Sequence, residues 1–188
     1  MLPPLLLPLL GLLGLLCVVS SAPMSNIEPS TRASLPLFVG GLPLLGTGVR
    51  KKGPIKVYAV SLYSPSTDAA SDAPLSSGKR AVFLKTVMKL PSTKMSAGLV
   101  DALSSRFGGP GDKLEELAGL IVGGCGGAEA GKGTTMQFEC SKDAVGVAIN
   151  GKPQGVVSSP GLGRSFVDIF TDRNAVSTLS GNLKKHFQ

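Results

Sequence analysis

Arg50 and Tyr58 are the residues whose types and spacing best suit chemistry on an apolar ligand with an anionic head. Both lie in the run from Gly46 to Tyr63, beside a strongly apolar stretch. The planar guanidinium of arginine can donate two hydrogen bonds to a carboxylate or an enolate, and a phenol can donate another to the same anion. A buried arginine is costly unless something negative meets it. The pair therefore predicts an oxyanion site.

The stretch Ile55–Tyr63 is apolar or aromatic at both odd and even positions, which predicts a strand buried on both faces. A plainer interpretation is that Arg50 ends a strand in solvent beside Lys51 and Lys52, while Tyr58 is an ordinary core residue. The residues alone leave both interpretations open.

Residues 1–22 predict an N-terminal targeting segment. They contain no charged side chain, an apolar stretch from about Leu5 to Val19, and the small residues Ser20, Ser21 and Ala22 at the expected cleavage point. Their prolines and glycines disfavour a membrane-spanning helix, although an uncleaved anchor is the alternative. Residues 23–188 are then long enough for one domain with a hydrophobic core.

Composition predicts a compact globular domain, with 43% hydrophobic residues and modest charge. The net charge of +7 is spread along the chain, so nucleic-acid binding is not expected. The lone His186 and the absence of an acidic cluster argue against a metal site, and we expect no cofactor. Cys125 and Cys140 could form a disulfide or remain free thiols.

The expected elements run as strands, helices, strands and helices, which favours an α+β fold with antiparallel pairing. Asp68–Lys79 predicts a loop and Ala81–Met88 a strand. A helix capped by Ser92 or Thr93 should carry Met95, Leu99, Leu103 and Phe107 and stop at Gly108-Gly109-Pro110. A second helix should begin with a capping box of Asp112 and Glu115, place Leu114, Leu117 and Ile121 inward, and end at Gly123.

Three more strands are expected at Gly133–Cys140, Ala144–Ile149 and Gly155–Ser158, with Asn150-Gly151 as a tight hairpin turn. Pro160 should open a helix, and Ser177 should cap a final one. Their inward residues are Leu162, Phe166, Ile169 and Phe170 in the first helix and Leu179 and Leu183 in the second.

The glycine-rich segment from Gly126 to Thr134 resembles a phosphate-binding loop. Such a loop must follow a parallel strand and open a helix, whereas this segment follows an amphipathic helix and leads into a strand. We therefore interpret it as a flexible connector.

The order of these segments resembles the chalcone isomerase-like family. The resemblance is carried by Gly46–Arg50, Lys56–Tyr63, Asn150-Gly151 with Gly155-Val-Val, Leu162–Phe170 and Ala175-Val-Ser177. It implies an open-faced sandwich, in which a curved antiparallel sheet is covered by helices with an apolar cleft between them. In the isomerases an arginine matching Arg50 holds the reacting phenolate. In the fatty-acid-binding members that arginine and a tyrosine matching Tyr58 hold a carboxylate.

Departures from the isomerases favour the fatty-acid-binding branch. Classical isomerases have a Thr at the position of Tyr58, and a catalytic Tyr followed by Asn on the helix that here begins at Thr93 and contains neither. Ile169 stands where they use a hydroxyl residue, and it cannot donate a hydrogen bond.

The leading hypothesis is a non-catalytic binder of a fatty acid or similar apolar carboxylate. Arg50 and Tyr58 would hold the head, and the tail would lie in a tunnel lined by Leu99, Leu103, Phe166 and Phe170, each of which could instead be ordinary core. The alternatives are an intramolecular lyase of the chalcone isomerase type, with Arg50 stabilising the transition state, or an accessory protein whose cleft is filled by Phe side chains.

We expect a monomer with a small apolar ligand, no nucleic-acid partner and no stable membrane insertion once the targeting segment is removed. That segment predicts entry into the secretory pathway. The final compartment could be secreted or lumenal, or a plastid reached through the endoplasmic reticulum.

Overall fold

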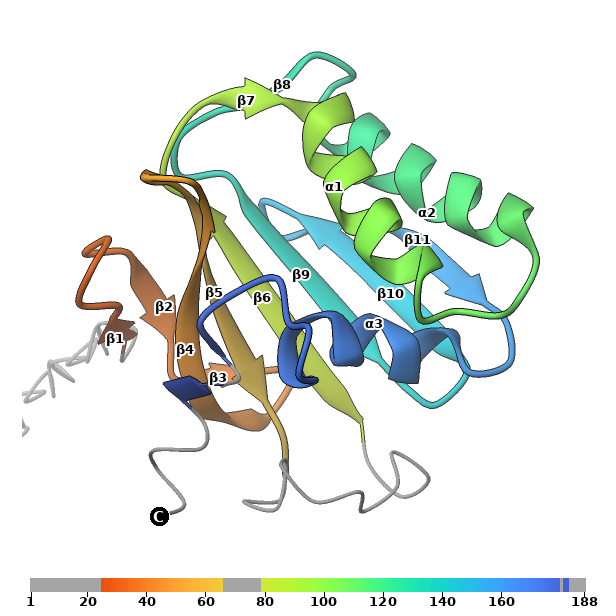
Figure 1. Cartoon of the computed structure of the whole chain (residues 1–188), viewed down its shortest axis with the longest axis horizontal. Coiled ribbons are helices and arrows are strands. Elements are labelled where there is room, and N and C mark those ends of the chain that lie inside the picture. The colour runs from red at the N-terminus through yellow and green to blue at the C-terminus, as the bar shows by residue number, and fades with distance from the viewer. Residues whose placement is uncertain (1–24, 66–78, 180, 183–188) are drawn as a thin grey trace, which may run out of the picture.

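The computed structural model describes residues 25–65, 79–179 and 181–182. A seven-stranded antiparallel sheet, in the order β11-β10-β9-β6-β5-β4-β3, forms one layer and helices cover one of its faces (Figure 1). The strands of this sheet are β3 (Phe38–Val39), β4 (Leu42–Lys52), β5 (Ile55–Tyr63), β6 (Arg80–Thr86), β9 (Thr135–Cys140), β10 (Ala144–Ile149) and β11 (Lys152–Ser158). This α+β sandwich confirms the predicted fold class.

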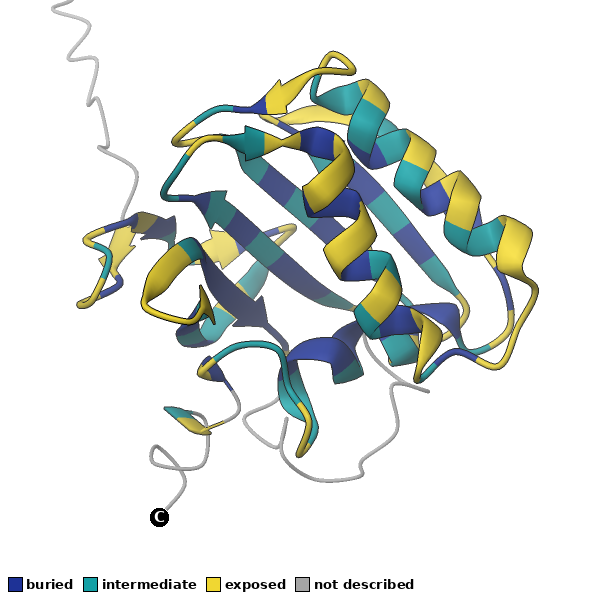
Figure 2. Ribbon diagram, turned by 45° about the horizontal axis from the view of Figure 1, so that its top comes forward, coloured by how far each residue is buried: buried dark blue, intermediate teal, exposed yellow. Residues whose placement is uncertain are grey.

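The helical layer consists of α1 (Ser92–Ser104), α2 (Gly111–Gly124) and α3 (Leu162–Thr171). Helices α1 and α2 lie side by side over the sheet and turn their buried sides toward it (Figure 2). The core between the layers includes Leu99 and Leu103 of α1, Leu117 of α2 and Phe166 of α3. Leu117 and Ile121 are buried as predicted, whereas Leu114 is only half-buried.

Two small strand pairs complete the structure. β1 (Ser25–Ile27) pairs with β2 (Ser34–Pro36), and β7 (Leu90–Pro91) pairs with β8 (Glu129–Ala130). Leu35 of β2 packs with Ala59 of β5 on the sheet face away from the helices. This second contact surface explains why β5 is buried on both faces from Tyr58 to Tyr63. The prediction of two-sided burial was wrong at the start of the strand, where Ile55 and Lys56 are exposed beside the turn from β4.

The strongest local predictions agree closely with the structure. β5 and β10 have the predicted bounds, and Asn150 and Gly151 both have positive φ, 49° and 75°, in the turn between β10 and β11. The glycine-rich segment indeed connects a helix, α2, to a strand, β9, and it also contributes the short strand β8. The predicted loop Asp68–Lys79 lies outside the described residues except for Lys79, and Leu183 of the predicted last helix also lies outside them.

The predicted N-terminal caps of α1 and α2 are wrong, whereas the hydroxyl of Ser177 accepts from the amide of Leu179 at 3.3 Å. Pro91 precedes α1 and Pro110 precedes α2, and neither helix has a side-chain cap. The hydroxyl of Ser92 instead donates to the carbonyl of Ala128, which ties the start of α1 to the segment before β8. Helix α1 also ends at Ser104, before Phe107, because tertiary contacts set its start and end.

The predicted targeting segment, residues 1–22, lies outside the described residues. No helix among the described residues is long and apolar enough to cross a membrane. Cys125 and Cys140 are both free thiols, and burial raises the pKa of each.

Candidate functional site

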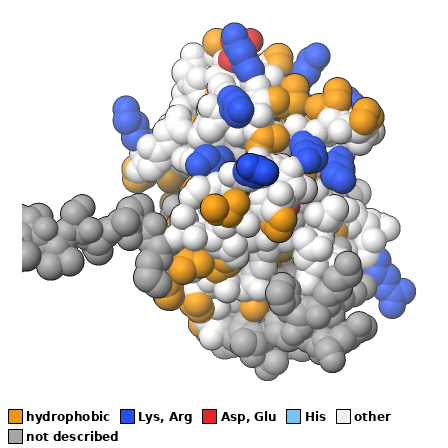
Figure 3. Space-filling view, turned by 90° about the vertical axis from the view of Figure 1, so that its left-hand side faces the viewer, with side chains coloured by type: hydrophobic (Ala, Val, Ile, Leu, Met, Phe, Trp, Pro, Cys, Tyr) orange, Lys and Arg blue, Asp and Glu red, His pale blue; other side chains and the backbone are white. Residues whose placement is uncertain are grey.

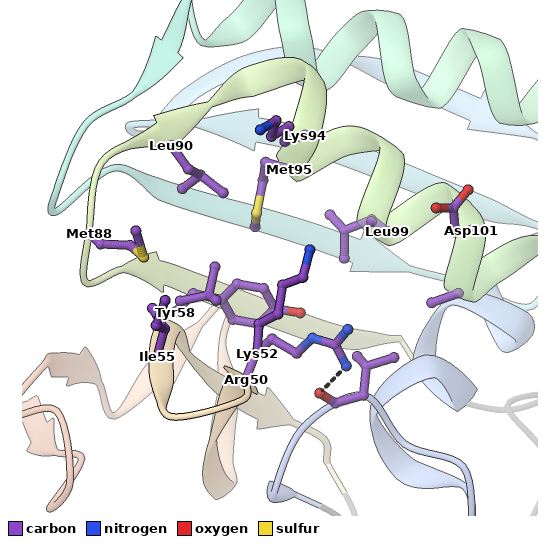
Figure 4. Close-up of a pocket in the computed structure, with 14 residues that line it drawn as sticks. Arg50, Lys52, Ile55, Tyr58, Met88, Leu90, Lys94, Met95, Leu99 and Asp101 are labelled. Carbon is purple, nitrogen blue, oxygen red and sulfur yellow. Dashed lines mark hydrogen bonds between the residues drawn. The ribbon is translucent and has the colours of Figure 1, made fainter.

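The β4–β5 hairpin places Arg50 directly opposite Tyr58. The two residues are paired across the antiparallel ladder, and the register shifts immediately after Arg50. Tyr58 is 4% exposed and Arg50 is half-buried. Both side chains face a pocket that lies between this hairpin and α1 (Figure 4). The solvent-exposed arginine of the plainer interpretation is thus not what the structure shows.

The pocket has a volume of about 570 Å³, within the usual range for small-molecule sites. Apolar side chains line most of it, namely Ile55, Val57, Met88, Leu90, Met95, Leu99, Ala102 and Val176. Its polar lining is mainly cationic and consists of Arg50, Lys52, Tyr58, Lys94 and Asp101. An apolar chain with an anionic head matches both parts of this lining.

Among the described residues, the Arg50 side chain has one hydrogen-bond partner. Its Nη1 donates to the carbonyl oxygen of Val176 at 2.7 Å, the bond dashed in Figure 4. No carboxylate among the described residues forms an ion pair with Arg50, so its remaining N–H donors are free to bind an anion.

Tyr58 supplies a neutral phenol beside this cation. Burial raises the pKa of Tyr58 well above its ordinary value, and the positive charge of Arg50 opposes part of that rise. Its hydroxyl forms no hydrogen bond with any described residue, and Figure 4 shows it on the same side as the guanidinium. Tyr58 can therefore donate to an anion held by Arg50 at any ordinary pH.

The segment after α3 closes one end of the pocket and holds Arg50 in place. The amide of Val49 donates to the hydroxyl of Thr178 at 2.9 Å, and the amide of Thr178 donates to the carbonyl of Val49 at 3.1 Å. This close approach requires Gly48, because a Cβ at that position would lie 2.3 Å from the amide nitrogen of Leu179. The segment thereby brings the Val176 carbonyl to Arg50.

A second arginine anchors the same segment to α1. Arg106 forms a two-pronged ion pair with Asp172, at 2.8 and 3.0 Å, and also donates to the carbonyls of Asn174 and Ala102. Every nitrogen of this guanidinium has a partner. Arg106 shows how an arginine with a structural role is paired in this protein, and Arg50 differs from it.

The four predicted tail-lining residues separate into two groups. Leu99 lines the pocket, whereas Leu103, Phe166 and Phe170 are fully buried in the core outside its lining. The ring centroids of Phe138 and Phe166 are 4.6 Å apart and those of Phe166 and Phe170 are 5.9 Å apart, so these rings pack on one another. The aromatic packing fills the space beneath α3, while the space beside Arg50 is open.

Sequence reasoning missed most of the apolar lining. Met95 precedes Leu99 by one helical turn, and this spacing was a usable signal. Met88 and Leu90 lie in the connection from β6 to α1, and Val176 follows α3, where no periodic pattern marks a pocket residue.

The chain is similar to known proteins in both family and fold. The model of a family described as chalcone isomerase-like matches residues 32–187. The crystal structure of an Arabidopsis thaliana fatty-acid binding protein superposes with a TM-score of 0.68 at 24% sequence identity, covering 82% of this chain and 92% of that one. A search of curated proteins found no match.

Proposed function

Because the chain belongs to the chalcone isomerase-like family, we propose that it binds a fatty acid or a similar apolar carboxylate in the pocket between the β4–β5 hairpin and α1. Arg50 holds the carboxylate and Tyr58 donates a further hydrogen bond to it. The observation that carries the proposal is the presence of an arginine without a carboxylate partner among the described residues, at the edge of an apolar pocket. The Arabidopsis protein with the same fold is described as a fatty-acid binding protein, which supports this choice.

The contrast between Arg50 and Arg106 supports an anionic ligand. Arg106 has a carboxylate and several carbonyls around it. Arg50 has one carbonyl, and withdrawing a guanidinium from water is costly unless an anion compensates. A ligand carboxylate would accept hydrogen bonds from Arg50 and balance its charge, as the carboxylate of Asp172 does for Arg106.

The apolar lining supports a hydrocarbon tail. Ile55 of β5 and Met95 and Leu99 of α1 lie on opposite sides of the pocket, so a chain between them contacts both layers. Methionine is flexible and fits irregular apolar shapes, which suits a tail of variable length. Each buried methylene contributes about 0.8 kcal/mol to binding.

Native mass spectrometry of the purified protein tests the proposal. We expect a co-purifying fatty acid, or palmitate binding after delipidation, and a loss of affinity of about 30-fold or more in Arg50→Ala because a charge-assisted contact is removed. Arg164→Ala is the matched control, since Arg164 is 60% exposed and its nearest carboxylate, Asp168, is 3.9 Å away. Unchanged palmitate affinity in a folded Arg50→Ala protein would refute the proposal that Arg50 holds the ligand carboxylate.

The same protein samples distinguish the fatty-acid binder from the alternative, an intramolecular lyase. The lyase would use Arg50 to stabilise a phenolate or enolate. The α1 residues that line the pocket are Lys94, Met95, Gly98, Leu99, Asp101 and Ala102, without the Tyr and Asn of the isomerases. An empty protein that closes a chalcone to a flavanone faster than buffer, and loses this activity in Arg50→Ala, would replace the binder proposal with the lyase.

A further inference from the structure

The rim of the pocket carries lysines on two sides. The β4–β5 turn contributes Lys51, Lys52 and Lys56, all exposed, and the ammonium of Lys56 also donates to the carbonyl of Ser30 between β1 and β2. Across the pocket, Lys89 precedes β7 and Lys94 lies in the first turn of α1. The face of the molecule at the turn end of this hairpin shows basic side chains around apolar ones, with few acidic side chains (Figure 3). We call these five lysines the basic rim.

The same turn exposes a large apolar side chain. Ile55 is 53% exposed and also lines the pocket, and it follows the exposed Gly53 and Pro54. An apolar side chain at a loop tip, flanked by lysines, is the arrangement by which peripheral proteins enter the headgroup region of a bilayer.

Acidic side chains of the described residues do little to neutralise the basic rim. Glu129 forms an ion pair with Lys89 at 2.5 Å, and Glu28 bonds to Ser30 and Thr31 in its own loop. Asp101 lies two helical turns beyond Lys94 in α1. The rim around the pocket is therefore net positive even after these groups are counted.

We propose that the basic rim docks on the surface of an anionic lipid membrane, with Ile55 inserted at the depth of the headgroups. Near such a surface each lysine contributes to attraction, and the attraction falls with added salt. Docking in this orientation opens the pocket toward the lipid, from which an apolar ligand can enter without crossing water. This inference goes beyond ligand binding and can be tested without a fatty acid.

Flotation of the full chain with vesicles tests the charge requirement. We expect binding to phosphatidylcholine vesicles that contain phosphatidylserine, and little binding to phosphatidylcholine alone. A Lys51→Gln/Lys56→Gln/Lys89→Gln variant should lose on the order of 25-fold in affinity, because Lys51 and Lys56 each contribute about fivefold near an anionic surface, whereas the charge of Lys89 is already paired with Glu129. None of these three lysines lines the pocket, so palmitate affinity in solution should not change.

The matched control removes the same number of charges elsewhere. Lys79, Lys142 and Lys152 are exposed and lie outside the pocket lining. Their triple Gln variant should keep most of the vesicle affinity. Every variant retains residues 1–24, so any contribution of that segment is common to all of them. Equal losses in the two triple variants would show a dependence on net charge alone and overturn the proposal.

A fluorescent reporter tests the orientation. The chain has no tryptophan, so Ile55→Trp introduces a unique fluorophore at the β4–β5 turn. Its emission should shift to shorter wavelength on mixing with fatty-acid-free anionic vesicles, and added salt should reverse the shift. Val156→Trp is the control, because Val156 is 64% exposed on the edge strand β11 and should not shift.

The vesicle and palmitate experiments can fail independently, so a failure of membrane docking can be told apart from a failure of ligand binding. A protein that binds palmitate but ignores anionic vesicles refutes the docking proposal alone. A protein that ignores vesicles yet binds poly-glutamate through the basic rim also refutes it, and shows an acidic polypeptide as the partner. Salt-sensitive vesicle binding that depends on the rim, in a protein without palmitate affinity, supports docking while the proposed function fails.

Discussion

The two tyrosines of the chain differ in what their hydroxyl groups contact. Tyr63 donates to the carbonyl of Pro36 at 2.7 Å and shares a hydrogen bond of 2.9 Å with Ser61. The hydroxyl of Tyr58 has no partner among the described residues and faces the pocket. A tyrosine with a structural role and one available to a ligand therefore lie on opposite faces of the same strand, β5.

This difference predicts opposite effects of removing each hydroxyl. Tyr58→Phe should weaken palmitate binding about 10-fold, the value of one hydrogen bond to a charged acceptor, with little change in the free energy of unfolding. Tyr63→Phe should leave palmitate affinity unchanged and lower the free energy of unfolding by about 1 kcal/mol, because the Pro36 carbonyl loses its donor. Calorimetric titration and urea denaturation of both variants measure these effects. The reverse pattern would remove Tyr58 from the site.

At the scale of elements, the β4 strand and the segment after α3 form one unit through Gly48. A Cβ at position 48 would lie 2.3 Å from the Leu179 nitrogen and 2.6 Å from its Cα, and this backbone cannot move aside cheaply. Gly48→Ala should therefore lower the free energy of unfolding by about 1 to 3 kcal/mol and also weaken palmitate binding, because Val176 moves away from Arg50.

Gly119→Ala provides the control of opposite sign. Gly119 lies within α2, and a Cβ there meets nothing within 4 Å. Replacing a helix-interior glycine by alanine should raise the free energy of unfolding by up to about 1 kcal/mol. Denaturant titration of both variants checks the prediction, and a neutral effect of Gly48→Ala would show that the segment can shift without cost.

The same elements show how far the sequence alone could lead. The strand Ile55–Tyr63 and the Asn150-Gly151 turn were predictable because their signals are local, namely apolar runs and positive-φ residues. The site was predictable at Arg50 and Tyr58, where a polar pair stands out beside an apolar strand. Met88, Leu90 and Val176 could not be predicted as lining, because their place in the pocket depends on how the connecting segments fold back.

The helix starts were mispredicted for a related reason. Asp112 and Glu115 form a good capping pattern, but α2 begins at Gly111 after Pro110. Phe166 and Phe170 fit a helix facing an apolar space, yet other aromatic rings fill that space. Local patterns give the apolar face of an element, and only packing decides whether that face meets another side chain or an open pocket.

For the whole molecule, burial of both tyrosines predicts a sensitivity to alkali. Burial raises the pKa of Tyr63 to about 12 and that of Tyr58 further, whereas in the unfolded chain both titrate near 10. Because the unfolded state loses these protons first, the tyrosines contribute full stability below pH of about 10, and this contribution is lost as pH rises toward about 12.

Spectroscopic titration of the native protein measures this effect. Tyrosinate absorbance should stay absent to pH of about 11 and then appear together with loss of secondary structure. The Tyr58→Phe variant should lose stability less steeply above pH of about 10. Tyrosinate formation near pH 10 in a protein that keeps its secondary structure would show that the hydroxyls are open to solvent.

The bond from Arg50 to Val176 makes the segment after α3 part of the candidate site, which matters for how natural variants of the gene are interpreted. A frameshift or stop codon between α3 and Val176 would leave the sheet and α1 encoded, yet would take away the carbonyl that fixes the guanidinium of Arg50. Natural alleles that alter the codons for this segment are therefore the first to examine for lost ligand uptake.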